Sequence, residues 1–148
     1  MIQFIKANLN EIRDKGRDYP WEKPCKCPKC NNFKVWGHGF VEAFFDGFSS
    51  PLLLKRYRCP NCGCVICYRP INYFKRFQSP IQTIRDCISC RLNTGRWRPG
   101  LSISRQGHWL RALKRRVIAF LGNSWRSKLI DAFDHLIKMG QIPVSRSI

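Results

Sequence analysis

Two cysteine pairs are the residues of this chain whose type and spacing point most directly to chemistry. Cys27 and Cys30 form one C-x-x-C pair, and Cys59 and Cys62 form another after a gap of 28 residues. Each pair can turn as a tight knuckle that places two thiolates on one side, and two knuckles together supply a tetrahedral set of four sulfurs for Zn²⁺. Because four protein ligands close the coordination shell, the sequence predicts one structural zinc ion in a zinc ribbon.

Five further cysteines lie outside these two pairs. The total of nine is odd, which argues against a fully paired disulfide framework. Cys25, Cys64 and Cys67 can replace a ligand, form a second metal site or pack as small apolar residues. Cys87 and Cys90 are one turn apart on a predicted helix, where they can bridge to a metal, although we expect them to face the helix core.

The charge of the chain indicates a polyanionic partner. It has 27 Lys+Arg against 9 Asp+Glu, a formal net charge of +18 and a pI of about 10.1. Nucleic acid is the first candidate, because neutralising phosphates releases counterions and so favours binding. An anionic membrane surface is the competing candidate. With 44% hydrophobic residues, the chain is too apolar for a disordered basic tail.

The cysteine pairs need a scaffold, and the hydrophobic pattern predicts one of class α+β. Apolar residues at helical spacing from Ile2 to Ile12 predict an N-terminal helix within residues 1–18, which Tyr19-Pro20-Trp21 ends. Runs rich in valine and aromatic residues then predict strands at 33–36, 40–45, 52–58 and 65–68, with a turn at Asp46-Gly47.

The second half of the chain reads as helical. Helices are predicted at 79–92, from 102 or 104 to 121, and from 123 or 124 to Gly140, followed by a loose tail at 141–148. The expected organisation is therefore an N-terminal helix and linker (1–21), a zinc ribbon (22–72) and a three-helix, helix-turn-helix-like module (73–148). The connection 93–101 is longer than the usual helix-turn-helix turn of about 3–4 residues, so the motif would be a variant.

The predicted helix after residue 102 has one apolar face and one basic face. A helix with hydrogen-bonding residues at its start and cations further along suits the major groove, where Arg reads guanine and Gln reads adenine. We expect Arg105, Gln106, His108 and Arg111 to contact bases or the groove. Phosphates are expected at the basic connection, at the helix start and at the later cations, which gives the set Arg96, Arg98, Ser104, Lys114, Arg115 and Arg116.

The predicted ribbon carries a second group of cations. Lys55, Arg56 and Arg58 are interleaved with aromatic residues such as Tyr57, and Tyr68 follows on the next strand. Such a pattern can stack on bases, and it can equally be an ordinary strand with one polar face.

Catalysis is not expected. His108 and Arg111 fit the H-x-x-R element of tyrosine recombinases, but the last tyrosine, Tyr73, lies upstream of it, where the nucleophile cannot be. A metal-dependent nuclease needs several carboxylates, and the cluster of Asp131, Asp134 and His135 reads as a solvated helix face. The N-terminal sequence has no apolar signal segment and no run is long enough to cross a membrane, so we expect a cytoplasmic, nucleoid-associated protein.

Residues 24 to about 117 resemble a family of small bacterial proteins that are often encoded in or beside mobile elements. The resemblance rests on four stretches, CPKCNNFKVWGHGF (27–40), LLLKRYRCPNCG (52–63), SPIQTIRDCISCRLNTGRW (79–97) and SRQGHWLRALKRRV (104–117). These proteins have an N-terminal zinc ribbon and a C-terminal helix-turn-helix. The resemblance implies sequence-specific binding of double-stranded DNA as an accessory or regulatory factor of a transposon or integrase system.

Two other functions fit the same sequence. Basic charge and aromatic residues also suit an RNA-binding component of a ribonucleoprotein complex, which would prefer single strands or loops and stack them on Tyr57 or Tyr68. The ribbon can also serve as an interaction module that docks on a recombinase, transposase or polymerase, or on a second copy of the chain.

Overall fold

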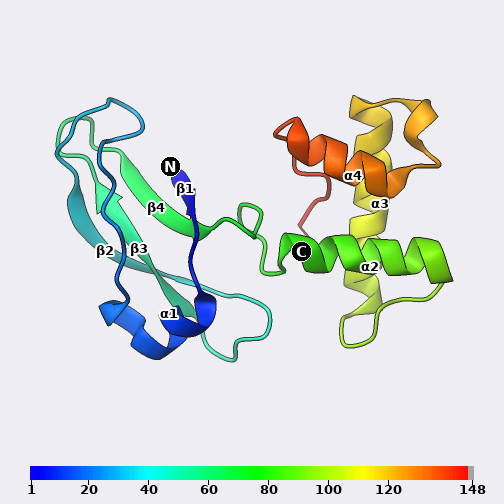
Figure 1. The fold of residues 1–148 in the computed structure, drawn as a ribbon, viewed down its shortest axis with the longest axis horizontal. Helices are drawn as coiled ribbons and strands as arrows, with labels where there is room; N and C mark the ends of the chain where they lie inside the picture. The colour runs from blue at the N-terminus through cyan, green and yellow to red at the C-terminus, as the bar shows by residue number, and fades with distance from the viewer. Residues whose placement is uncertain (147–148) are drawn as a thin grey trace. The chain divides into compact units, whose positions relative to one another are not determined.

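The structure is a computed structural model that describes residues 1–146. The chain folds into two compact units, Met1–Gln78 and Ser79–Ile148. The first unit contains a four-stranded sheet and a short helix, and the second contains three longer helices (Figure 1). The fold is therefore mixed α+β, as the sequence predicts. No helix within residues 1–146 combines the length and the apolar character needed to cross a bilayer.

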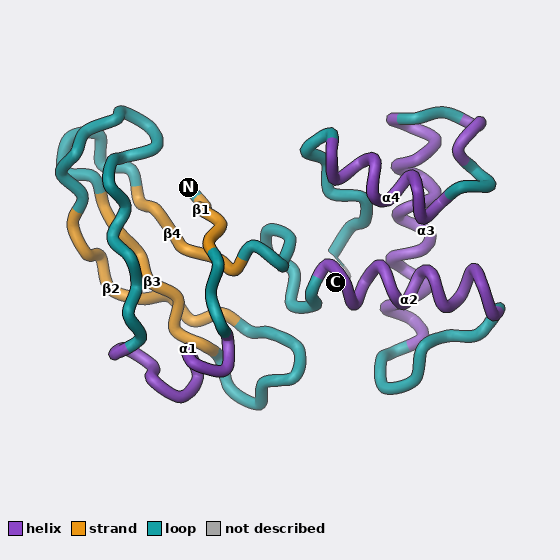
Figure 2. Tube along the Cα trace, in the orientation of Figure 1, coloured by secondary structure: helices purple, strands orange, loops and turns teal. Residues whose placement is uncertain are grey.

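The sheet of the first unit has the strand order β1-β4-β3-β2. Its strands are β1 (Ile2–Ile5), β2 (Trp36–Ala43), β3 (Leu52–Arg58) and β4 (Val65–Pro70). Strands β2, β3 and β4 form antiparallel pairs, whereas β1 runs parallel to β4. Figure 2 shows the four strands in orange. Strand β2 contains a bulge between Gly37 and Phe40, where Gly39 has a φ of 71°, a conformation that glycine adopts without a steric cost.

The prediction of one helix across residues 1–18 is wrong for its first part. Ile2–Ile5 form β1, which pairs with the edge of β4 in the register Ile2↔Cys67. Helix α1 is confined to Leu9–Lys15, and the Asn8 side chain caps it by accepting hydrogen bonds from the N–H groups of Asn10 and Glu11. The edge of β4 supplies backbone hydrogen-bond partners for this segment, and a β-branched residue such as Ile suits a strand. The predicted strand at 33–36 is also absent, except that Trp36 begins β2.

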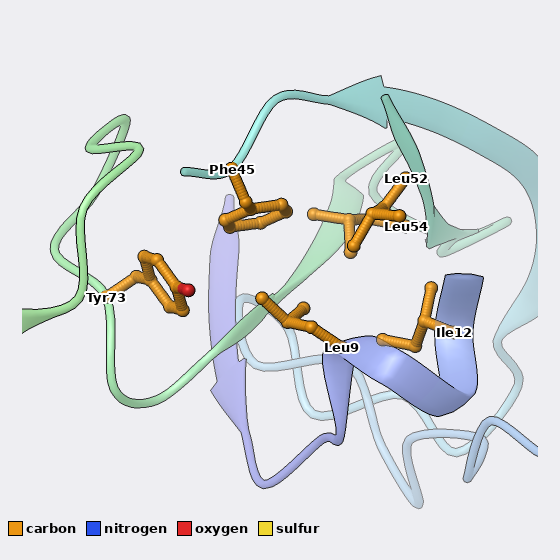
Figure 3. Close-up of a cluster of buried hydrophobic side chains, with 6 residues drawn as sticks. All are labelled: Leu9, Ile12, Phe45, Leu52, Leu54 and Tyr73. Atoms are coloured by element: carbon orange, nitrogen blue, oxygen red, sulfur yellow. The ribbon is translucent and has the colours of Figure 1, made fainter. Parts of the chain in front are cut away.

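Helix α1 closes a small hydrophobic core on the sheet. Leu9 and Ile12 of α1 point toward Leu52 and Leu54 of β3 (Figure 3). Phe45 and Tyr73 complete this cluster, with their ring centroids 4.8 Å apart in an edge-on arrangement. Burying each such side chain contributes about 1.5–3 kcal/mol, so this contact holds the N-terminal segment on the sheet.

The second unit contains α2 (Ile81–Thr94), α3 (Ile103–Phe120) and α4 (Leu129–Lys138). Helix α3 packs against both neighbours through buried side chains that include Trp109, Leu113 and Val117. Helix α2 is joined to α4 by an ion pair, in which Arg85 Nε and Nη2 each donate to one carboxylate oxygen of Asp134 at 2.9 Å.

Two expectations for the end of the chain are wrong. The third helix of this unit begins at Leu129 rather than at 123 or 124, and Asn123–Trp125 form a 3₁₀ turn instead. Residues 141–146 are not a loose tail, because Val144 is buried and Ser145 Oγ lies 3.0 Å from His108 Nε2. The predicted tail also includes residues 147–148, which lie outside the described residues.

Candidate metal centre and nucleic-acid interface

The two C-x-x-C pairs fold as matching knuckles. In the first, the N–H of Asn31 donates to the carbonyl of Cys27 at 2.9 Å, and the N–H of Cys27 donates to the carbonyl of Asn32 at 2.8 Å. In the second, the corresponding bonds join Gly63 to Cys59 at 3.0 Å and Cys59 to Cys64 at 2.9 Å. Both knuckles turn at a residue with positive φ, 59° at Asn31 and 70° at Gly63. Asn and Gly are the residues that tolerate this conformation best.

The knuckles bring the four predicted sulfurs together. The Sγ atoms of Cys27, Cys30, Cys59 and Cys62 all lie within 4.8 Å of one another. Cys27 Sγ is 3.6 Å from Cys62 Sγ, and Cys30 Sγ is 3.5 Å from Cys59 Sγ. Four sulfurs at about 2.3 Å from one zinc ion lie about 3.8 Å apart in a tetrahedron, so the spacing and the donor chemistry fit Zn²⁺. These four cysteines can hold a metal ion such as zinc.

The protein surroundings favour thiolate at Cys27 and Cys30 and disfavour it at Cys62. The Cys30 N–H lowers the pKa of Cys27, while the Asn32 N–H and the Asn61 amide lower the pKa of Cys30 to about 6. The Cys64 N–H also lowers the pKa of Cys62, but burial and the sulfurs of Cys30, Cys27 and Cys59 outweigh it and raise that pKa to about 12. Four thiolates at this spacing therefore need a cation to neutralise them.

The remaining cysteines do not belong to this four-sulfur cluster. Within residues 1–146, the four-cysteine centre is the one cluster of three or more His, Cys, Asp or Glu side chains placed to share a metal. Cys25 is exposed, and half-buried Cys64 packs against the buried cluster that contains Cys27 and Cys59. Cys87 is buried within α2, in agreement with the expectation that it faces the helix core.

Helix α3 presents the cations expected at a nucleic-acid interface. Ser104, Arg111, Lys114 and Arg115 are exposed, and the last three lie together because they are spaced i, i+3 and i+4. We call Arg111, Lys114 and Arg115 the α3 basic face. Arg116 is half-buried and lines a shallow pocket with Ala112, Arg115 and Ser145.

Gln106 is not placed to read a base. It is fully buried, Oε1 accepts a hydrogen bond from the Arg98 N–H at 3.0 Å, and Nε2 donates to the carbonyls of Arg98 at 2.8 Å and Leu101 at 3.1 Å. Its position on the α3 surface that faces the α2–α3 loop explains this, because that loop needs partners for its backbone groups. The expectation of a base contact from Gln106 is therefore corrected to a structural role.

Three other candidates are engaged within the protein. The Arg105 guanidinium lies over the Trp109 ring at 5.2 Å from its centroid, and half-buried His108 contacts Ser145. Arg98 is exposed, and its Nη1 lies 3.4 Å from an Asp86 carboxylate oxygen. Arg96, in the same loop, is exposed as expected.

The cations of β3 do not share one surface. Arg56 and Arg58 alternate with Lys55, so they lie on the opposite face of the strand. Lys55 Nζ is held over the rings of Phe40 at 4.4 Å and Tyr57 at 5.8 Å. Tyr57 and Tyr68, which the sequence suggested as stacking residues, are each only 4% exposed, so they belong to the core.

Two asparagines at the metal centre were not predicted from the sequence. Asn31 occupies the positive-φ position that Gly63 occupies in the second knuckle, and Asn61 Nδ2 lies 3.7 Å from Cys30 Sγ. The first had a signal, because Asn follows Cys30 just as Gly follows Cys62. The second had none, because Asn61 and Cys30 are brought together only by folding.

Comparisons of this chain with protein-family models, with curated proteins and with solved structures found no match.

Proposed function

We propose that this protein is a zinc-stabilised, non-catalytic DNA-binding protein that contacts duplex DNA through the α3 basic face. The observation that carries the proposal is a long stretch without negative charge around α3. Between Asp86 and Asp131 the chain has ten Lys+Arg and no Asp or Glu. Carboxylates would repel phosphates, so their absence here leaves a field of one sign over the helix.

The shape of the interface supports duplex DNA. An α-helix fits the major groove, and Arg111 can bond two acceptors of guanine at once. Lys114 and Arg115 flank Arg111 on the exposed surface and suit backbone phosphates. The opposite surface of α3 is buried against α2 and α4, so the helix is held as one rigid element.

The metal has a structural role in this proposal. All four ligands come from protein side chains, which leaves no open position for a substrate, so zinc would brace the knuckles rather than take part in a reaction. Cys27 and Cys59 are fully buried beside Val35 and Tyr57, so bound metal would fix the segment 27–35 on the sheet.

The alternatives have less support. The RNA-binding function would use Tyr57 and Tyr68 to stack bases, but both side chains are buried. Docking on a recombinase or polymerase has no specific contact in its favour, and the link to a transposon or integrase system rests on the sequence resemblance alone.

The test is selection of duplex sequences from a random pool, followed by affinity measurement with the selected site. We expect substitution of both Arg111 and Arg115 by Ala to abolish the preference for that site. Lys138→Ala removes an exposed cation at the end of α4, outside the stretch between Asp86 and Asp131, and serves as the control. Loss of preference in the control variant to the same degree would contradict the assignment of the α3 basic face.

A further inference from the structure

The sheet of the first unit carries arginines beside aromatic and aliphatic side chains on one face. Trp36 of β2, Arg58 of β3 and Val65 of β4 lie directly opposite one another. Residues paired across strands share a face, and every second residue of a strand returns to it. Arg56 therefore lies on this face with Arg58. It pairs with Cys67 of β4, which in turn pairs with Ile2 of β1.

Strand β1 extends this face by one aromatic residue, because Phe4 pairs with Arg69, two residues after Cys67. We call the group the open sheet face. It consists of Ile2, Phe4, Trp36, Arg56, Arg58, Val65 and Cys67.

Three residues of the open sheet face are exposed, namely Phe4, Trp36 and Arg58, and the other four, Arg56 among them, are half-buried. Trp36 is 60% exposed and Phe4 is 43% exposed. Tyr57 lies between Arg56 and Arg58 in β3 and points to the other face of the sheet. It is 4% exposed, its partner Ile66 is fully buried, and both pack with Cys27 and Cys59 of the metal centre. Leu52 and Leu54 lie on the same face of β3 as Arg56 and Arg58, but they are buried in the cluster with α1. The part of this face that α1 leaves uncovered still exposes large aromatic groups, which is uncommon without a partner.

The charge of this face is positive and unneutralised. None of its seven residues is acidic, and neither Arg56 nor Arg58 forms an ion pair within the described residues. Arg69 shares the face but is occupied, because its guanidinium donates to the carbonyls of Phe74 and Phe77. The whole unit, residues 1–78, has 14 Lys+Arg against six Asp+Glu, a formal charge of +8.

We infer that the open sheet face binds single-stranded DNA, with an unpaired base stacked on Trp36 and phosphates bound by Arg58 and Arg56. Aromatic rings next to cations are the combination that binds single strands, since every base has a flat face and every linkage a charge. A duplex keeps its bases stacked inside, so it cannot use Trp36 in this way.

The chemistry of the face gives RNA no advantage through the hydrogen of its ribose 2′-OH. That hydrogen contributes to binding only when the protein offers it an acceptor. The side chains of the open sheet face contain no oxygen atom. The inference rests on the proposed function only in that both take DNA as the partner; the residues involved are different.

The experiment measures fluorescence anisotropy with the full-length, zinc-loaded chain at about 0.1 M salt. The probes are a labelled single strand of about 20 nucleotides without self-complementarity, its duplex, and an RNA strand of the same sequence. Trp36→Ala should weaken binding of the DNA single strand about 5- to 100-fold, the range expected for one lost base stack. Arg58→Ala should weaken it too, and both variants should bind the duplex within about twofold of the wild type.

Matched controls come from the same unit. Phe44 is 59% exposed but lies outside the open sheet face, so Phe44→Ala should leave single-strand binding unchanged. Lys23→Ala removes one exposed charge from the segment that lines the opposite side, near Tyr68. A zinc content equal to that of the wild type establishes that each variant is folded.

Two results would overturn the inference: equal effects of Trp36→Ala and Phe44→Ala on the single strand, or tighter binding of the RNA strand than of the DNA strand. Failure of the proposed function looks different. In that case replacing Arg111 and Arg115 by Ala leaves duplex binding unchanged, while Trp36→Ala still weakens binding of the single strand.

Discussion

The side-chain amide of Gln106 pairs with the backbone of Arg98 as a neighbouring strand would, accepting from its N–H at 3.0 Å and donating to its carbonyl at 2.8 Å. Arg98 belongs to the α2–α3 loop and Gln106 belongs to α3, so these hydrogen bonds fix how the loop enters the helix. A polar residue that the sequence assigns to the nucleic-acid interface thus organises the unit from inside.

Replacing Gln106 should therefore cost stability. Gln106→Ala leaves the N–H and carbonyl of Arg98 without their partner, which we expect to lower the free energy of unfolding by about 1–3 kcal/mol. Urea unfolding followed by circular dichroism measures this. Gln82→Ala, at an exposed position of α2, is the control and should change stability by about 0.5 kcal/mol or less. If Gln106→Ala left the free energy of unfolding unchanged, the backbone groups of the loop would have found other hydrogen-bond partners.

Metal removal should unfold the first unit. Purified protein is expected to contain one zinc ion per chain, and Cys30→Ser should lose it, because three sulfurs and a hydroxyl form a much weaker site. Metal analysis and tryptophan fluorescence follow the two effects. Cys25→Ser, at an exposed cysteine outside the cluster, should retain the metal. If Cys25→Ser released zinc as Cys30→Ser does, the assigned ligand set would be wrong.

The ion pair between α2 and α4 predicts a pH dependence. The hydrogen bond from Arg85 lowers the pKa of Asp134. A carboxyl group whose pKa is lower in the folded state stabilises the fold above its ordinary pKa of about 3.9, and this is lost as the pH falls through the folded-state value. Since both side chains are partly exposed, we expect about 0.5–1 kcal/mol at pH 7.

A double-mutant cycle of Asp134→Asn with Arg85→Gln measures this coupling in urea. The coupling should be present at about pH 7 and decline below about pH 4. Comparing variants at one pH cancels effects that they share, such as loss of metal from the first unit. A coupling that grew on acidification would contradict a lowered pKa of Asp134 in the folded protein.

Gly107 offers a test of how the α3 basic face is organised. A Cβ at this position would lie 3.1 Å from Arg111 Nη1 and 3.8 Å from the Trp97 ring. The Arg111 guanidinium is the end of a flexible chain and can move, while Ala gains up to about 1 kcal/mol in helix propensity. We expect Gly107→Ala to be neutral or slightly stabilising in thermal unfolding, and to change duplex affinity through the displaced arginine. A large loss of stability would mean that the Trp97 side chain cannot move to accommodate the added methyl group.

The sequence predicted the parts of this protein that depend on local chemistry. The C-x-x-C spacing identified Cys27, Cys30, Cys59 and Cys62, because a knuckle is formed by adjacent residues whose geometry is set locally. Helices α2 and α3 were predicted within about two residues of their bounds, because their apolar residues recur with a strong helical period.

Only the tertiary structure decided what depends on distant partners. Ile2–Ile5 form a strand because the edge of β4 lies beside them, and the same apolar spacing would suit a helix in isolation. The pleat of β3 separates Lys55 from Arg56 and Arg58, so three neighbouring cations do not form one surface. Gln106 is buried because a loop folds over it. Type and spacing thus determined which residues could bind a metal or a polyanion, and packing determined which of them remain exposed to do so.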